Sequence, residues 1–67
     1  MEDKQKILDL LLPALQETRK LCDLKKLEYD AETEDVIATF ENGYQKKANV
    51  YYDSGTAMIR DVIDQII

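Results

Sequence analysis

Residues 49–60 read NVYYDSGTAMIR, and within them an alternating strand pattern changes to a helical one with almost no linker. The alternation ends at Tyr52, and apolar residues recur at helical spacing from Met58 onward. Asp53 or Ser54 is expected to cap this helix, because their side-chain oxygens accept hydrogen bonds from the free N–H groups of a first turn. The last strand and the last helix must therefore fold back on each other, and the remaining chain has to pack against this junction.

Alternating stretches upstream of the junction predict three strands. The first stretch begins at Leu24, the second covers residues 36–41 and the third covers residues 44–52. An acidic loop, residues 30–35, joins the first two. Short connections of this kind favour antiparallel neighbours, and we expect a meander.

The loop between the second and third strands decides which side chains share a face. A two-residue Asn42-Gly43 loop would divide the apolar residues of the two strands between both faces. A three-residue loop with Gly43 in the left-handed region pairs Phe40 with Tyr44 and gathers the apolar residues on one face. We predict the three-residue loop.

The N-terminal segment from Asp3 to about Leu21 carries apolar residues at helical spacing over an arc of roughly 200°. Pro13 lies on the polar side of this arc. It either kinks one continuous helix or begins a second helix after a short turn. We favour the continuous, kinked helix, in which the lost hydrogen bond lies on the solvent side.

These elements predict an α+β fold of order α-β-β-β-α, a three-stranded antiparallel meander with two helices packed on one face. Residues 1–67 are expected to form a single small domain. The predicted core combines residues of the first helix, the second and third strands and the last helix: Leu11, Leu15, Val36, Ala38, Phe40, Ala48, Val50, Tyr52, Ile59, Val62 and Ile63.

The order of elements resembles that of the double-stranded RNA-binding domain. That family opens its last helix with a lysine-rich motif that reaches across phosphates, whereas residues 54–61 here read SGTAMIRD, with one base and one acid. The resemblance therefore implies the topology and none of the RNA contacts.

Composition narrows the classes of function. The chain has 67 residues, a formal charge of −5, no histidine and a lone Cys22, so neither a disulfide nor a Cys/His zinc site can staple the fold. No apolar run is long enough to span a membrane. A free thiol fits a reducing compartment, and we expect a soluble cytoplasmic protein. The net negative charge argues against general binding to nucleic acid.

The sequence predicts neither catalysis nor a cofactor. Cys22 and Ser54 lack a histidine partner, and no glycine-rich phosphate loop is present. The acidic loop carries Asp35 where a calcium loop needs glycine, and strands flank it, so no metal site is expected. We expect a non-enzyme.

Basic residues are expected to gather at one end of the sheet, because the first and third strands of a meander start at the same end. They come from these strand starts and from the end of the first helix: Arg19, Lys20, Lys25, Lys26, Lys46 and Lys47. The strand lysines, Lys25, Lys26, Lys46 and Lys47, are candidate anion contacts. For Arg19 and Lys20, we favour solubility and compensation of the helix dipole over a functional role.

Two apolar surfaces are candidate protein interfaces. The outer face of the sheet should carry Ile37, Thr39, Lys47, Asn49 and Tyr51, a mixture found at interfaces. The wide arc of the first helix leaves Leu10, Leu12 and Leu21 at its edges. Either a weak or moderate symmetric homodimer covers Leu12 or Leu10 and Leu21, or the Pro13 kink wraps the helix around the core and buries both edges within the monomer. The leading hypothesis is a small protein-binding or regulatory module whose partner is another, unidentified protein. The alternative is a nucleic-acid-associated accessory protein that uses the basic end.

Overall fold

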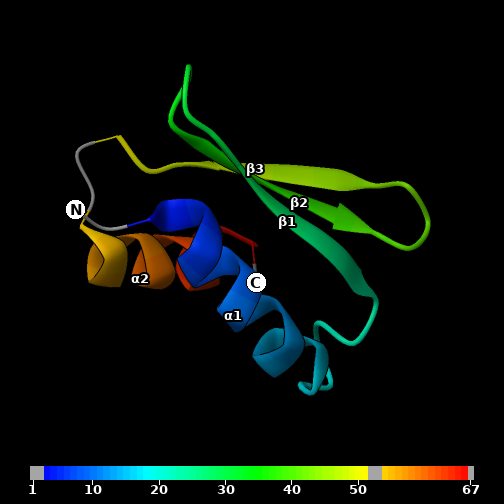
Figure 1. Cartoon of the computed structure of the whole chain (residues 1–67). Coiled ribbons are helices and arrows are strands. Elements are labelled where there is room, and N and C mark those ends of the chain that lie inside the picture. Colours follow the sequence, from blue (N-terminus) through cyan, green and yellow to red (C-terminus); the bar gives the residue numbers. More distant parts are fainter. Residues whose placement is uncertain (1–2, 52–53, 67) are drawn as a thin grey trace.

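The computed structural model describes residues 3–51 and 54–66, and in these residues two helices lie on one side of a three-stranded sheet (Figure 1). The elements follow in the order α1 (Lys4–Gln16), β1 (Leu24–Asp30), β2 (Asp35–Phe40), β3 (Gln45–Asn49) and α2 (Gly55–Ile66). The sheet is an antiparallel meander of order β1-β2-β3. The predicted fold class is confirmed.

Helix α1 is shorter than the sequence pattern predicted. Asp3 caps it, with its side chain accepting a 3.1 Å hydrogen bond from the Lys6 N–H. The Thr18 hydroxyl donates to the carbonyl of Leu15 at 2.6 Å and accepts the N–H of Leu21 at 3.3 Å, so the chain leaves the helix here. A hydroxyl that competes for backbone groups favours such an ending. The predicted extension of the helix to Leu21 is therefore wrong.

Pro13 lies within α1, which runs unbroken on both sides of it. The proline is exposed, as expected for a position on the polar side of the helix. Because proline has no N–H, the carbonyl of Asp9, four residues earlier, lacks its helical hydrogen bond. This carbonyl lies on the solvent side, where water can bind it. The prediction of one continuous helix across Pro13 is confirmed.

Two glutamines join α1 to the free edge of β1. The Gln5 side chain accepts the N–H of Tyr29 at 2.8 Å and donates to the carbonyl of Leu27 at 3.2 Å, as a neighbouring strand would. Gln16 donates to the carbonyl of Leu24 at 2.9 Å. An exposed strand edge is open to pairing with other chains, and these contacts occupy part of this one.

The register between β2 and β3 is the predicted one. Phe40 N–H donates to the Tyr44 carbonyl at 2.8 Å, and Gly43 N–H donates to the Phe40 carbonyl at 2.9 Å. Gly43 has φ +87°, in the left-handed region that glycine adopts at little cost. In β1, a bulge at Lys25 shifts the register between Leu24 and the following residues, which the sequence pattern did not predict.

Helix α2 begins at the junction that organises the chain. Ser54 Oγ accepts the N–H of Ala57 at 3.2 Å, and the Ser54 carbonyl accepts the N–H of Met58 at 2.8 Å. The predicted cap is confirmed at Ser54, whereas the alternative cap Asp53 and the core candidate Tyr52 lie outside the described residues.

The core lies between the sheet and the two helices. It differs from the prediction in both helices, and it also contains Leu24 and Leu27 of β1 and Leu21 of the segment before it, which were not in the predicted core. Leu8 and Leu15 fill it from α1, while Leu11 is half-buried at its margin. The core residues are Leu8, Leu15, Leu21, Leu24, Leu27, Val36, Ala38, Phe40, Ala48, Val50, Met58, Val62 and Ile66. Ile59 is half-buried and Ile63 is 39% exposed, so α2 is rotated from the predicted orientation toward Met58 and Ile66.

Candidate functional site

The outer sheet face is the side of the meander that no helix covers (Figure 1). Alternation along each strand and the observed register place three rows of side chains on it. The rows run across the sheet as Lys26–Thr39–Gln45, Glu28–Ile37–Lys47 and Asp30–Asp35–Asn49. Ile37 is the apolar member of these rows and is half-buried.

Polar side chains of the outer sheet face bind one another. Gln45 donates to the Thr39 hydroxyl at 3.1 Å, and Lys26 forms a 3.3 Å ion pair with Glu28. Asn49 donates to the Asp35 carboxylate at 3.0 Å.

The pKa of Asp35 is affected by the same contacts. It is lowered by the hydrogen bonds from Asn49 and Thr33 and, to a smaller extent, by the charge of Lys47.

Tyr51, the last candidate of this face, follows the end of β3 and is 53% exposed. The face is therefore largely satisfied by contacts within the sheet.

The predicted basic end is divided between two faces. The starts of β1 and β3 do lie at the same end of the sheet, but Lys46 and Lys47 alternate to opposite sides. Lys46 Nζ donates to the carbonyl of Ile66 at 3.2 Å, at the C-terminal end of α2, where a cation is favourable. Lys25 lies at the bulge, and Arg19 and Lys20 are exposed in the segment after α1. The candidate anion contacts thus do not share one surface.

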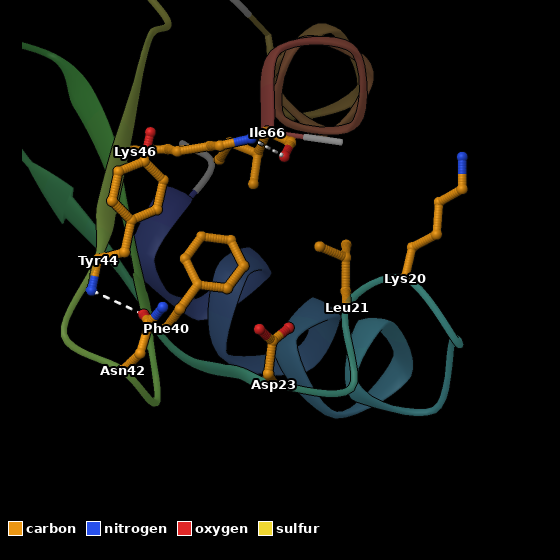
Figure 2. A pocket seen from close by; sticks show the side chains of 8 residues that line it. All are labelled: Lys20, Leu21, Asp23, Phe40, Asn42, Tyr44, Lys46 and Ile66. Atoms are coloured by element: carbon orange, nitrogen blue, oxygen red, sulfur yellow. Dashed lines mark hydrogen bonds between the residues drawn. The ribbon is translucent and has the colours of Figure 1, made fainter.

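A pocket of about 340 Å³ opens at this end of the molecule (Figure 2). Leu21, Phe40 and Ile66 form its apolar part, and the ring of Tyr44 lies 6.2 Å from that of Phe40 between centroids. Tyr44 is 59% exposed. The remaining lining residues are polar: Lys20, Asp23, Asn42 and Lys46.

The charges of this pocket do not select for one kind of ligand. The Asp23 carboxylate is directed between Phe40 and Leu21, whereas Lys20 extends away from the other side chains (Figure 2). Lys46 crosses to α2 and is engaged there. An anion would meet the Asp23 carboxylate, and a cation would meet the amine of Lys46. This pocket is better interpreted as the place where the segment after α1 covers the core than as a site for one class of ligand.

A second hollow lies between the two helices, on the side away from the sheet. Helix α1 packs on β1 and α2 packs on β3, so a groove remains between them. We call it the helical groove, and its volume is about 330 Å³. It is shallow and open, and apolar residues line it: Ile7, Leu10, Leu11, Ala14 and Ile59. Leu10 is 69% exposed.

The three helix-edge candidates have different surroundings. Leu21 is 3% exposed and packs in the core from the segment after α1, so it has no surface to offer a partner. Leu12 is partly buried against the core. Leu10 remains as the exposed apolar side chain of the helix.

The sequence pattern did not identify Ile7, Ala14 and Ile59 as surface residues. Helical periodicity shows that such residues lie toward one side of a helix, but it does not show how far apart two helices pack. The groove depends on that separation, since each helix covers a different edge strand. Two helical wheels drawn side by side would reveal the groove only if the relative positions of the two helices were already known.

Within residues 3–51 and 54–66, no helix is long and apolar enough to cross a membrane. The same residues contain no group of three or more cysteine or acidic side chains placed to hold a metal ion. The double-stranded RNA-binding domain carries lysines at the start of its last helix. In α2, the base of the matching stretch is Arg60, and its Nε lies 3.9 Å from the carboxylate of Asp64. Comparison of the chain with protein-family models, curated proteins and solved structures produced no match.

Proposed function

We propose that this protein is a small protein-binding module, without catalytic activity, whose binding surface is the helical groove. One observation carries the proposal: an apolar groove between α1 and α2 is bordered by Leu10, which is 69% exposed. A large apolar side chain in water beside an apolar groove favours burial against a partner. We expect the protein to act in the cytoplasm, where its exposed Cys22 thiol would stay reduced.

The outer sheet face supports binding less strongly than the helical groove. Many of its polar side chains already have partners within the sheet, and its apolar side chain, Ile37, is half-buried. Replacing those hydrogen bonds by contacts to a partner would bring little net gain. The alternative function, contact with nucleic acid, would need lysines on one surface, and they are divided.

Capture from a native cell lysate with matched variants tests the proposal. Immobilised wild-type protein should retain a protein that Leu10→Lys does not retain and that the control Ile37→Lys, a change on the outer sheet face, still retains. Retention should persist between about 50 and about 200 mM salt, because apolar burial is little screened. A differently tagged copy of this chain is included among the proteins offered.

Two results would contradict the proposal. Retention that depends on Ile37 and not on Leu10 would place the binding surface on the sheet. Retention of nucleic acid that fades steeply over the same salt range would favour the alternative function.

A further inference from the structure

We propose that the partner that covers Leu10, at the edge of the helical groove, is a second copy of this chain, docked with its α1 antiparallel to the first. The inference rests on the proposed function, since it names the partner of the same surface. Leu10 projects beside the groove that its own helix helps to line. A two-fold axis beside Leu10 lets each copy pack this side chain against Pro13 and Ala14 of the other, at the edge of the groove.

Charges on α1 indicate the antiparallel direction. At 100° per residue, Lys6 and Glu17 both lie within about 40° of Leu10 around the helix, on the side of Leu10 away from the groove. Glu17 follows the last turn and keeps a helical backbone, with φ −80° and ψ −10°. The midpoint between Lys6 and Glu17 falls about 2 Å along the axis from Leu10, at 1.5 Å of rise per residue. A two-fold axis at that midpoint brings Lys6 of each copy opposite Glu17 of the other.

The same two charges are unfavourable within one helix. Lys6 lies near the N-terminus of α1 and Glu17 at its C-terminus, and the helix has neither an acid in its first turn nor a base in its last. A helix dipole favours the opposite distribution. In the antiparallel pair, Glu17 lies near the N-terminus of the other helix and Lys6 near its C-terminus, so both charges become favourable.

Neither charge has an ion-pair partner in the part of the chain that the structure describes. Both side chains are exposed and available to a second copy. The axis also sets Leu10 opposite Pro13 of the other copy, and both residues are exposed in the monomer. Apolar contact at the centre and an ion pair at each end make the surface complementary to itself.

Sedimentation equilibrium from about 10 μM to about 1 mM protein tests the inference. Wild-type protein should shift from the monomer mass toward twice that mass. Leu10→Lys should weaken self-association by about 100-fold or more, because it places a charge at the centre of the contact. A cooperative thermal melt confirms that each variant remains folded.

Charge reversal tests the antiparallel direction. Lys6→Glu and Glu17→Lys, each alone, should weaken self-association by about tenfold. An equal mixture of the two variants should restore it, because each contact between unlike copies again joins opposite charges. Lys6→Glu should also raise the melting temperature of the monomer slightly, since it removes a cation from the helix N-terminus. The control Lys25→Glu makes the same charge change at the β1 bulge and should leave self-association unchanged.

The outcomes separate this inference from the proposed function. The wild-type protein could stay monomeric near 1 mM while Leu10-dependent capture of another protein persists. That result would contradict self-association but would still support the proposed protein-binding function. A mixture of charge variants that fails to restore the dimer would overturn the antiparallel arrangement. If Leu10→Lys changed neither self-association nor capture, both proposals would be wrong.

Discussion

On the outer sheet face, polar side chains meet partners on the neighbouring strand, whereas on the helical side apolar side chains border a groove that no described residue fills. Asn49 and Asp35 illustrate the first case, with a hydrogen bond of 3.0 Å. Leu10 illustrates the second, with 69% of its surface in water. A sheet can satisfy its outer face by pairing side chains across strands. Here α1 and α2 cover different edges of the sheet and leave an apolar surface open between them.

The strongest way to sharpen this comparison is to truncate the buried and exposed leucines of α1. Leu8 is fully buried, so Leu8→Ala should lower the free energy of unfolding by about 2 to 5 kcal/mol, enough to unfold much of a domain this small. Leu10→Ala, measured at low micromolar concentration, should change it by less than about 0.5 kcal/mol. Urea denaturation measures both. Equal losses would mean that Leu10 is part of the core.

A second test concerns the attachment of α1 to the sheet edge. Gln5→Ala removes the partners of the Tyr29 N–H and the Leu27 carbonyl, so it should cost about 1 to 3 kcal/mol of stability. Gln45→Ala is the matched control on the outer sheet face, where the hydrogen bond to Thr39 is exposed and water can replace it. Denaturant unfolding should show a loss for the first variant and almost none for the second. The reverse order would contradict the placement of α1.

A third test breaks the register that assigns residues to the two faces. Gly43 has φ +87°, and a Cβ there would meet no atom within 4 Å, so the backbone conformation alone sets the cost of a substitution. Gly43→Ala should lose about 1 to 2 kcal/mol in thermal or urea unfolding. Asn tolerates this conformation better, and Gly43→Asn should lose less. An alanine variant as stable as the wild type would argue against the three-residue loop.

The smallest expected effect lies on the outer sheet face. The pKa of Asp35 is held below its usual 3.8, chiefly by the hydrogen bond from Asn49. A lowered pKa in the folded state means that the stabilisation is complete above pH 3.8 and is lost as the pH falls through the lowered value.

Asn49→Ala should therefore return the pKa of Asp35 toward 3.8, as measured by NMR titration of its carboxyl carbon. Gln45→Ala should leave that titration where it is in the wild type. A titration of Asp35 that does not respond to Asn49→Ala would show that the polar pairs of this face are not formed.

Features set by local chemistry could be predicted from the sequence. The order of elements, the cap at Ser54 and the loop at Gly43 depend on neighbouring residues and are confirmed. The extent of α1 could not be predicted, because Leu21 continues the helical spacing and the hydrogen bonds of Thr18 become apparent only in three dimensions.

The orientation of α2 and the candidate site depend on tertiary contacts. Met58, Ile59, Val62, Ile63 and Ile66 form a wide apolar arc, and the sheet decides which part of it is buried. Leu10 was found from the sequence as a candidate contact, but the groove beside it was not. Its walls come from two helices that lie far apart in the chain, and no spacing within one helix reports their separation.

A dilution series followed by ¹H–¹⁵N NMR tests most directly whether the helical groove or the outer sheet face is the contact surface. As the protein concentration rises toward about 1 mM, the amide signals of Lys6, Leu10, Ala14 and Glu17 should shift together. Those of Ile37, Lys47 and Asn49 should remain in place. Shifts confined to the outer sheet face, with the signals around Leu10 stationary, would contradict the account.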